Sequence, residues 1–324
     1  MHSIKKYLKA LKYVIAAVSL FAGAGLVLII VISAIHFSYD VDAPLTREEV
    51  EAAQKYYTEA YRKPVSENQE RSERSEYETK YIRVAEAAAN DFRIEEQISA
   101  FVKRFNLSDQ PVLEIGSGRG YLQDAAQNYT GLDISPSVAR FYHKKFVVGS
   151  ATAMPFPDNS FEAIWSIWVF EHVPNPEQAF REARRVMRDN GVLFLFPAWN
   201  CTSWAADGYE VRPYSDFGVA GKLIKASIPL RSSQLFKVMA LVPNRIVRRF
   251  VARFGPTRLR YRRLNPNYEK YWVRDSDAVN SIDSHEAILW FLSRGDECLN
   301  CDDASVFLPM GSVPFIIRVH KSVA

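Results

Sequence analysis

Cysteine is scarce in this sequence, which has only Cys201, Cys298 and Cys301 among its 324 residues. An odd and low number is poor material for a disulfide framework, so we expect a reducing compartment. Cys298 and Cys301 form one Cys-x-x-Cys. Because a single pair supplies only two ligands, a zinc site would need two more, from Asp302, Asp303 or histidines. We interpret the spacing as coincidental, with zinc binding and a disulfide as alternatives.

Strong charge and a disorder-promoting composition are also absent. The net charge is +4 at pH 7, which does not argue for a nucleic-acid partner. With 48% hydrophobic residues, the chain can bury a sizeable core. Its length allows one large domain or two small ones.

One long uncharged run is present near the N-terminus. No residue from Val14 to Ile35 is charged, and a helix of that length is about 33 Å long, roughly the thickness of the hydrocarbon core of a bilayer. Ser33 and Ala34 are small, as at the cleavage site of a signal peptide. The apolar region of a signal peptide is shorter, however, about 7–15 residues. We therefore expect residues 1–40 to be an uncleaved, single-pass membrane anchor.

Helices are expected after this run. Thr46-Arg-Glu-Glu49 has the spacing of a capping box, which predicts the start of a helix. A charged, Ser-rich stretch follows, and the apolar spacing from Tyr81 to Phe105 then predicts amphipathic helices. We interpret residues 41–106 as a helical lid or linker that packs on a core. In the alternative, sharper interpretation, Tyr77 or Tyr81 covers a bound cofactor.

The next part of the chain alternates strand-like and helix-like segments, which predicts a mostly parallel sheet with helices on both faces. In such sheets, ligands bind at the carboxyl ends of the strands. The expected strands are Val112–Ile115, Thr130–Ser135, Phe146–Val148, Phe161–Ile167 and Gly191–Phe196. The expected helices are Gly120–Gln127, Pro136–Lys145 and Pro176–Arg188.

Three glycines at alternate positions, Gly116, Gly118 and Gly120, follow the first of these strands. Residues without a Cβ allow a tight turn whose backbone approaches a ligand. Glu114, just before them, can accept a hydrogen bond from an amine or a hydroxyl but would repel a pyrophosphate. Asp133 lies at the end of the second strand, where a carboxylate can bind both hydroxyls of a ribose. Together these residues favour an adenosyl ligand over a dinucleotide.

Two later motifs complete the pattern. Gly149–Phe161 follows the third strand, and Trp168-Val-Phe-Glu-His-Val173 follows the fourth. With these motifs, residues 111–200 resemble the class I S-adenosylmethionine-dependent methyltransferases of the type 11 group. The resemblance implies a Rossmann-like, doubly wound α/β sheet with an antiparallel last strand, and S-adenosyl-L-methionine as the cofactor. It says nothing about the substrate.

The resemblance also implies a set of cofactor-binding residues. The glycine turn and Glu114 before it would hold the methionine part of the cofactor. Asp133 would hold the ribose. Residues near the ends of the next strands would contact the adenine. The family usually has an acid where Ser150 stands, so a serine would hold the adenine amino group more weakly. The predicted cofactor-binding residues are Glu114, Gly116, Gly118, Gly120, Asp133, Ile134, Ser150, Ala151 and Ser166.

Glu171 and His172 are the candidate catalytic residues, because they lie just beyond the fourth expected strand. Methyl transfer needs a base only if the acceptor must lose a proton. Relatives that methylate polyprenyl quinone precursors have a similar Glu-His pair, with an acid where Trp168 stands here. We therefore expect no metal site, and contacts at the start of a helix are the alternative role for the pair.

Residues 201–279 are expected to be an insertion. From Cys201 to Asp275 there are 15 Lys and Arg and five Asp and Glu, a net charge of +10, and apolar residues lie between them. Pro243 is expected to divide two short helices. Such a basic amphipathic segment is typical of a surface that binds an anionic membrane or an acidic acceptor such as a lipid-linked phosphate. The alternative is an ordinary helical subdomain with a solvated basic face, and we expect no nucleic-acid partner.

The last segment, residues 280–324, is expected to join residues 107–200 in one methyltransferase domain. Ser284 is expected to cap a helix that runs through Arg294. The expected closing strands are Val306–Leu308 and Val313–Val319.

The sequence thus predicts a membrane-anchored methyltransferase of a lipid-soluble or lipid-linked acceptor, either hydrophobic or anionic. The alternatives are a methyltransferase of a soluble metabolite or glycan, and a non-enzymatic adaptor with a degenerate methyltransferase fold. Four lysines precede the uncharged run and few basic residues follow it closely, which predicts a catalytic domain outside the cytoplasm. The supply of the cofactor argues for the cytoplasm, which we expect.

Overall fold

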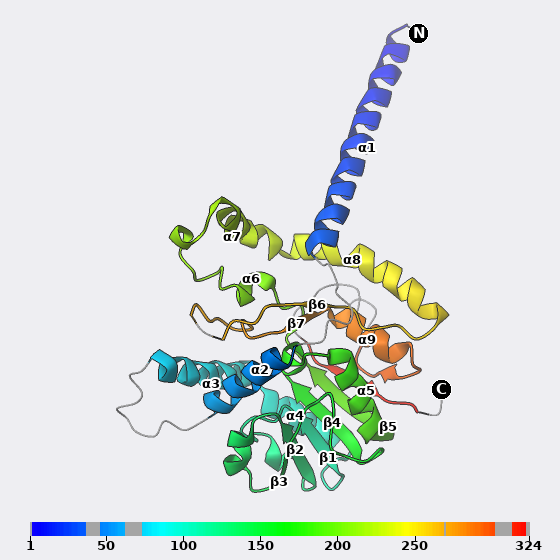
Figure 1. The fold of residues 1–324 in the computed structure, drawn as a ribbon. Helices are drawn as coiled ribbons and strands as arrows, with labels where there is room; N and C mark the ends of the chain where they lie inside the picture. The colour runs from blue at the N-terminus through cyan, green and yellow to red at the C-terminus, as the bar shows by residue number, and fades with distance from the viewer. Residues whose placement is uncertain (1, 37–45, 62–72, 269, 302–312, 322–324) are drawn as a thin grey trace.

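The computed structural model describes residues 2–36, 46–61, 73–268, 270–301 and 313–321. A seven-stranded sheet lies at the base of the molecule, and a second layer of helices with a small two-stranded sheet lies above it (Figure 1). The N-terminal helix projects away from both layers.

The large sheet has the strand order β3-β2-β1-β4-β5-β9-β8. Its first five strands are parallel, and β9 lies antiparallel between β5 and β8. This arrangement confirms the predicted doubly wound sheet with an antiparallel closing strand. One expected strand, at 306–308, lies outside the described residues. The strands are β1 Val112–Ile115, β2 Tyr129–Asp133, β3 Lys145–Val148, β4 Phe161–Ile167, β5 Met187–Phe196, β8 Glu297–Cys298 and β9 Phe315–Arg318.

Two of the expected crossover helices are wrong. The segment after the glycine turn forms only the short 3-10 helix η2, Gln123–Ala125, and the segment after β2 forms the 3-10 helix η3, Pro136–Phe141. The reason is length: once the glycine turn is made, too few residues separate β1 from β2 for an α-helix to cross back over the sheet. The third crossover, α5 (Pro176–Val186), is a regular helix, and its strand β5 begins earlier than expected.

Helix α4, Ile94–Arg104, covers the face that these crossovers leave open. Its buried side chains Ile98 and Phe101 belong to one apolar cluster with Leu122, beside η2, and Trp165 of β4. The N-terminal segment therefore supplies a layer that the crossovers do not. The preceding helices are α1 His2–His36, α2 Arg47–Ala60 and α3 Glu73–Asp91, and Thr46 and Glu49 form the predicted capping box of α2.

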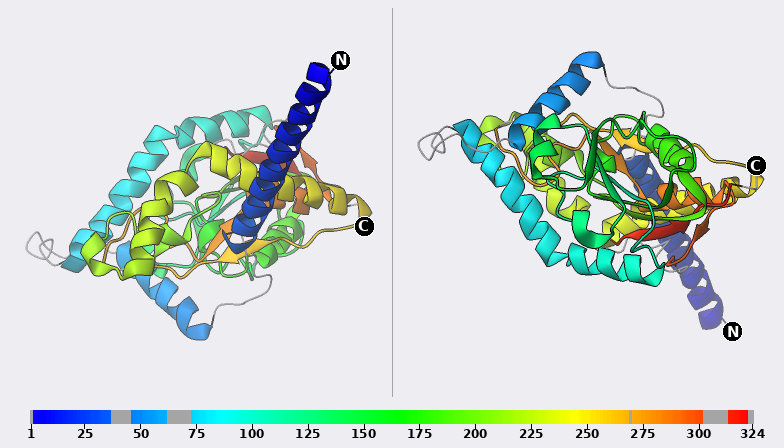
Figure 2. Two further views of the ribbon diagram at one scale, coloured as in Figure 1. Left: turned by 90° about the horizontal axis from the view of Figure 1, so that it is seen from above. Right: turned by 90° about the horizontal axis from the view of Figure 1, so that it is seen from below.

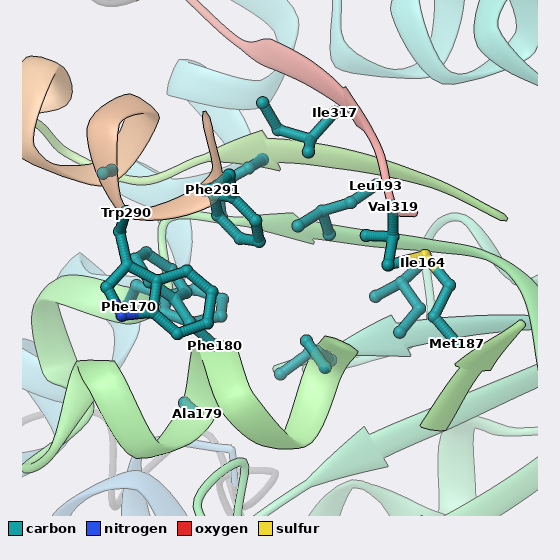
Figure 3. Packing of buried hydrophobic residues seen from close by; sticks show 14 of the residues in the cluster. Ile164, Phe170, Ala179, Phe180, Met187, Leu193, Trp290, Phe291, Ile317 and Val319 are labelled. Carbon is teal, nitrogen blue, oxygen red and sulfur yellow. The ribbon is translucent and has the colours of Figure 1, made fainter. Parts of the chain in front are cut away.

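Helices α5 and α9 (Ser284–Leu292) pack on the opposite face of the sheet. Phe170, Phe180, Trp290 and Phe291 meet there with aromatic rings in close contact (Figure 3). The cap of α9 is Asp283, whose carboxylate accepts a hydrogen bond from the amide of His285, so the expected Ser284 cap is wrong by one residue.

Helix α1 is the one helix among the described residues that is long and apolar enough to cross a membrane. Its window Leu11–Leu28 has a mean hydropathy of 2.0, and no part of that window is buried inside the protein. Length and composition alone support a membrane span, and they leave the side on which the remaining chain lies undetermined.

The expected insertion forms a helical layer above the large sheet (Figure 1). Contrary to the prediction, α8 runs unbroken through Pro243. Pro243 is exposed, so neighbouring side chains do not prevent the local bend that accommodates its ring. The elements of this layer are α6 Ser203–Ala206, η5 Tyr214–Asp216, α7 Val219–Arg231, α8 Gln234–Val251, η6 Ala252–Phe254, and the antiparallel pair β6 Tyr261–Arg263 and β7 Asn280–Ile282.

A buried ion pair joins α8 to α9. The Arg245 side chain is fully buried, and its Nε lies 3.0 Å from Oδ2 of Asp283. One turn further on, Nε of Arg248 lies 2.7 Å from Oε1 of Glu286. These pairs hold the insertion on the large sheet.

We expect Arg245→Ala to lower the free energy of unfolding by about 3–5 kcal/mol, because Asp283 would remain buried without its partner. Urea unfolding of the full chain in detergent micelles measures the change. Arg253→Ala, at an exposed position, is the control and should stay within about 0.5 kcal/mol. Equal effects of the two substitutions would show that the buried pair is not stabilising.

Candidate active site

The glycine turn lies at the carboxyl end of β1 and is closely packed. Gly116, Gly118 and Gly120 have φ values of 69°, 49° and 71°, a region that L-residues with side chains rarely adopt. A Cβ on Gly116 would lie 2.2 Å from Cγ2 of Val169. The turn therefore depends on glycine for its conformation and for its contact with the segment after β4.

Asp133 connects this turn to the end of β2. Its Oδ2 accepts a hydrogen bond from the amide of Gly118 at 2.9 Å, and its Oδ1 accepts one from the amide of Ser135 at 2.8 Å. Burial raises the pKa of Asp133, and the backbone amides partly oppose that rise. The structure thus brings together the residue predicted for the ribose and the turn predicted for the methionine part.

Glu114 lies buried in β1 and accepts a hydrogen bond from the hydroxyl of Tyr129. Burial raises the pKa of Glu114 to about 8, although the hydrogen bond from Tyr129 opposes the rise. At neutral pH its carboxyl group therefore carries a proton for much of the time.

The other predicted cofactor residues lie along the same edge. The hydroxyl of Ser166 donates to the carbonyl of Ile115 at 3.1 Å and so connects β4 to β1. Ser150 and Thr152 share a hydrogen bond between their hydroxyls of 2.8 Å. Ile134 and Ala151 are half-buried. Their contacts with a cofactor remain predictions.

Helix α2 and the residue after it lie across this edge. Gln54 donates to the carbonyl of Ile134, and the hydroxyl of Ser137 donates to the carbonyl of Thr58 at 2.9 Å. The hydroxyl of Tyr61 lies 3.2 Å from the place where a Cβ on Gly118 would stand. The sequence reasoning missed this role of α2.

Tyrosines from α2 and α3 gather above the same edge. Tyr81, one of the two residues expected to cover a ligand, packs edge-on against Tyr61 and Trp272. The side chain of Tyr77, the other, lies outside the described residues. Tyr57 packs edge-on against His172 with ring centroids 5.8 Å apart.

Glu171 and His172 lie in the 3-10 helix η4, Phe170–His172, just beyond β4. Glu171 is fully buried, and neither of its carboxyl oxygens has a hydrogen-bond partner among the described residues. Burial raises the pKa of Glu171 to about 7, although the charge of His172 opposes the rise. His172 Nε2 lies 3.8 Å from Oε1 of Glu171.

Asp277, which the sequence reasoning missed, fixes the other side of the His172 ring. Nδ1 of His172 lies 3.2 Å from the backbone carbonyl oxygen of Asp277 and 3.6 Å from its Oδ2. Because a carbonyl oxygen only accepts, Nδ1 carries the proton and Nε2 keeps the lone pair in neutral His172. Tyr57 donates its hydroxyl to Oδ2 of Asp277 at 2.9 Å.

The charges around His172 shift its pKa upward. Burial disfavours the imidazolium, but Asp277 and Glu171 raise the pKa of His172 above its usual value. Asp275, two residues before Asp277, adds a further negative charge nearby. The signal that could have found this site is Asp275-Ser-Asp277, two acids at the end of an otherwise basic segment.

Trp168 adopts a strained backbone conformation between the two halves of the site. Its φ is 52°, which is uncommon for a bulky residue, and its amide donates to the carbonyl of Phe196 at 2.7 Å. This conformation turns the chain after β4, so that Val169 meets the glycine turn and η4 meets Asp277.

The interpretation of the Cys-x-x-Cys spacing as coincidental is wrong. Cys298 and Cys301 are joined by a disulfide, so their spacing is not coincidental. Cys201 is buried and free. In the part of the chain that the structure describes, no group of three or more His, Cys, Asp or Glu is arranged to hold a metal ion.

Comparison with known proteins covers the part of the chain that contains these residues. Residues 113–195 match the family model described as a methyltransferase domain. They include the glycine turn, Asp133 and the Glu171–His172 pair. These residues form a domain of the class that uses S-adenosylmethionine, as the sequence predicted.

The chain is similar to named methyltransferases over part of its length. It is 26% identical over 179 residues to the fatty-acid O-methyltransferase of Mycolicibacterium smegmatis, covering 49% of this chain and 65% of that protein. It is 32% identical over 102 residues to the 2-methyl-6-phytyl-1,4-hydroquinone methyltransferase of Synechocystis, covering 28% and 32%. Both matches span less than two thirds of the relative. Among solved structures, the YcgJ protein of Bacillus subtilis is 25% identical, with a TM-score of 0.30, over 32% of this chain and 51% of that chain.

We expect Gly116→Ala to weaken the binding of S-adenosylmethionine about tenfold or more, because the added Cβ meets Val169 in a strained conformation that costs about 1–3 kcal/mol. Gly218→Ala is the matched control, since no atom lies within 4 Å of its added Cβ. Calorimetric titration of the full chain in detergent measures both. Wild-type affinity in Gly116→Ala would mean that the turn does not contact the cofactor.

Proposed function

We propose that this protein is an S-adenosylmethionine-dependent methyltransferase that acts at a membrane on a lipid-soluble or lipid-linked acceptor. The proposal rests on one observation: two groups of residues lie along the same edge of the sheet. The Asp133-bound glycine turn fits the cofactor, and His172, oriented by Asp277, fits an acceptor that must lose a proton.

The residues at the first group fit the cofactor. Asp133 is a buried carboxylate at the ribose position, and the glycine turn brings backbone close to it. When bound, S-adenosylmethionine supplies a methyl group on a sulfonium that is already activated for displacement. The role of the protein is then to position the two reactants in line and to exclude water.

His172 is the proton acceptor in this proposal. Its Nδ1 is held by Asp277, so the lone pair on Nε2 is available to take a proton from the acceptor. Tyr57 donates to Asp277 and keeps that carboxylate in place. Glu171, buried beside Nε2, stabilises the imidazolium once it forms.

The electrostatics of the site support a hydroxyl or an amine as the reacting group. Glu171, Asp275 and Asp277 surround His172 with negative charge, which disfavours a carboxylate or a phosphate at the reacting position. The two named relatives act on a fatty acid and on a phytyl hydroquinone. Of these two acceptor classes, the hydroquinone offers hydroxyl groups.

The membrane part of the proposal is supported by α1 and its composition. We place the catalytic domain in the cytoplasm, where the cofactor is made. The lysines before the span and the Cys298–Cys301 disulfide argue for the opposite side. The two placements predict that the cofactor must be present on opposite faces of a sealed membrane.

We expect labelled S-adenosylmethionine added to sealed inside-out membrane vesicles that contain the protein to label material extracted by organic solvent. Right-side-out vesicles should become labelled only after permeabilisation, because the charged cofactor does not cross the bilayer. Vesicles that contain the Gly116→Ala chain are the control for background labelling. Label in the aqueous fraction alone would contradict a lipid acceptor, and label in intact right-side-out vesicles would contradict the cytoplasmic placement.

We expect His172→Gln to lower the rate of methyl transfer by about 10²–10⁴-fold, since it removes the proton acceptor. In the unchanged chain the rate should rise with pH as His172 loses its proton, because only the deprotonated base is active. Glu171, with its pKa raised to about 7, should contribute to the same rise. His143→Gln, at an exposed histidine paired with Asp124, is the control. An unchanged rate and pH profile in His172→Gln would exclude His172 as the base.

A further inference from the structure

Two arginines of helix α8 point toward the interior of the protein. Arg245 and Arg248 face α9, where they pair with Asp283 and Glu286. Both acids are almost fully buried. On the side of α8 that packs on the protein, Arg245 and Arg248 are therefore both paired with acids of α9 or its cap.

The opposite side of α8 is apolar and exposed. The side chains of Phe250 and Phe254 are 58% and 77% exposed, and they pack edge-on against each other. Leu235 is 69% exposed. The exposed apolar residues of α8 and the turn after it are Leu235, Ile246, Val247, Phe250, Val251 and Phe254.

This distribution is the reverse of the one in a helix at the surface of a protein in water. Such a helix buries its apolar stripe and exposes its charges. A continuous exposed apolar face marks a surface that another phase or partner covers. Helix α7 extends the same kind of surface, because Leu223 and Leu230 are 67% and 66% exposed.

The position of α1 identifies the covering phase. Helix α8 lies between α1 and the layer that holds β6, β7 and α9 (Figure 1), and α1 contacts α8. The view from above shows α1 rising over α8 (Figure 2). Since Arg245 faces α9, the apolar side of α8 faces the side from which α1 projects.

We propose that α7 and α8 lie in the boundary of the bilayer that α1 crosses, with this apolar face among the acyl chains. A helix with one apolar and one basic face lies in the plane of the interface and enters it by about 5–10 Å. Lys222 and Arg253 are exposed at its margins, where they meet anionic head groups. The inference rests on the membrane part of the proposed function and is independent of its chemistry.

This contact fixes the orientation of the active site. The chain from β6 to β7 links the layer of α8 to Asp277, whose Oδ2 lies 3.6 Å from Nδ1 of His172. A lipid acceptor in the same leaflet then approaches the site from the side of Asp277.

A site-specific fluorophore tests the contact in the full chain. Cys201 is buried and Cys298 is bonded to Cys301, so a new exposed cysteine is the reactive thiol. Phe250→Cys and Leu223→Cys would each carry the environment-sensitive dye NBD, in vesicles of phosphatidylcholine and phosphatidylglycerol. Lys145→Cys, on strand β3 at the far end of the molecule, is the matched control (Figure 1).

Dyes at positions 250 and 223 should emit at shorter wavelength, lose most of their fluorescence to lipids brominated on the acyl chain, and resist iodide in the water. The dye at 145 should show the reverse. Quenching by iodide and not by brominated lipid at position 250 would overturn the proposal. Self-quenching that grows with the ratio of protein to lipid would overturn it in favour of a second copy of the chain on this face.

A second pair of variants keeps this result separate from the catalytic proposal. Phe250→Glu should move the dye at 223 toward water and leave cofactor affinity unchanged. Gly116→Ala should weaken cofactor binding and leave the dye at 223 in the lipid. An unmoved dye in Phe250→Glu would count against the insertion of α8 even if methyl transfer is observed.

Discussion

The hydrogen bonds from two backbone amides to the carboxylate of Asp133 determine the arrangement of the whole sheet edge. One amide belongs to the glycine turn after β1 and the other to the loop after β2, so a single side chain fixes two neighbouring strand ends. The position of the turn then sets the position of Val169, which packs on Gly116. Val169 begins the segment that carries His172. The glycine turn and His172, the proposed proton acceptor, are therefore linked by direct packing, and strain at Trp168 is tolerated within this connection.

Local patterns in the sequence predicted the strands and the glycine turn well, because apolar runs and spaced glycines act over a few residues. The contacts of these residues with a cofactor stay predictions. The second half of the site could not be predicted in this way. His172 and Asp277 are 105 residues apart, and Tyr57 is 220 residues from Asp277. No periodicity reports a contact of that range. The expected helices after β1 and β2 failed for a different reason, since helical propensity cannot supply the residues that a crossover needs.

The chain between α8 and α9 belongs neither to the core alone nor to the insertion alone, because it has a role in each. It holds the basic helical layer above the sheet, and through Asp277 it orients a histidine that belongs to the methyltransferase domain. Asn280 of β7 also donates to the carbonyls of Phe170 and Val173, on either side of that histidine. Attachment to the core and the orientation of His172 are thus coupled within one segment, which lies outside residues 113–195, the part of the chain that matches the family model.

The short crossovers after β1 and β2 have a consequence for how this protein is made. Ile98 and Phe101 of α4 fill the place of the missing helices, so the segment that follows α1 is a structural layer of the sheet. Synthesis produces this layer before any strand, and its apolar face closes fully only after Trp165 of β4 and Phe194 of β5 have been made.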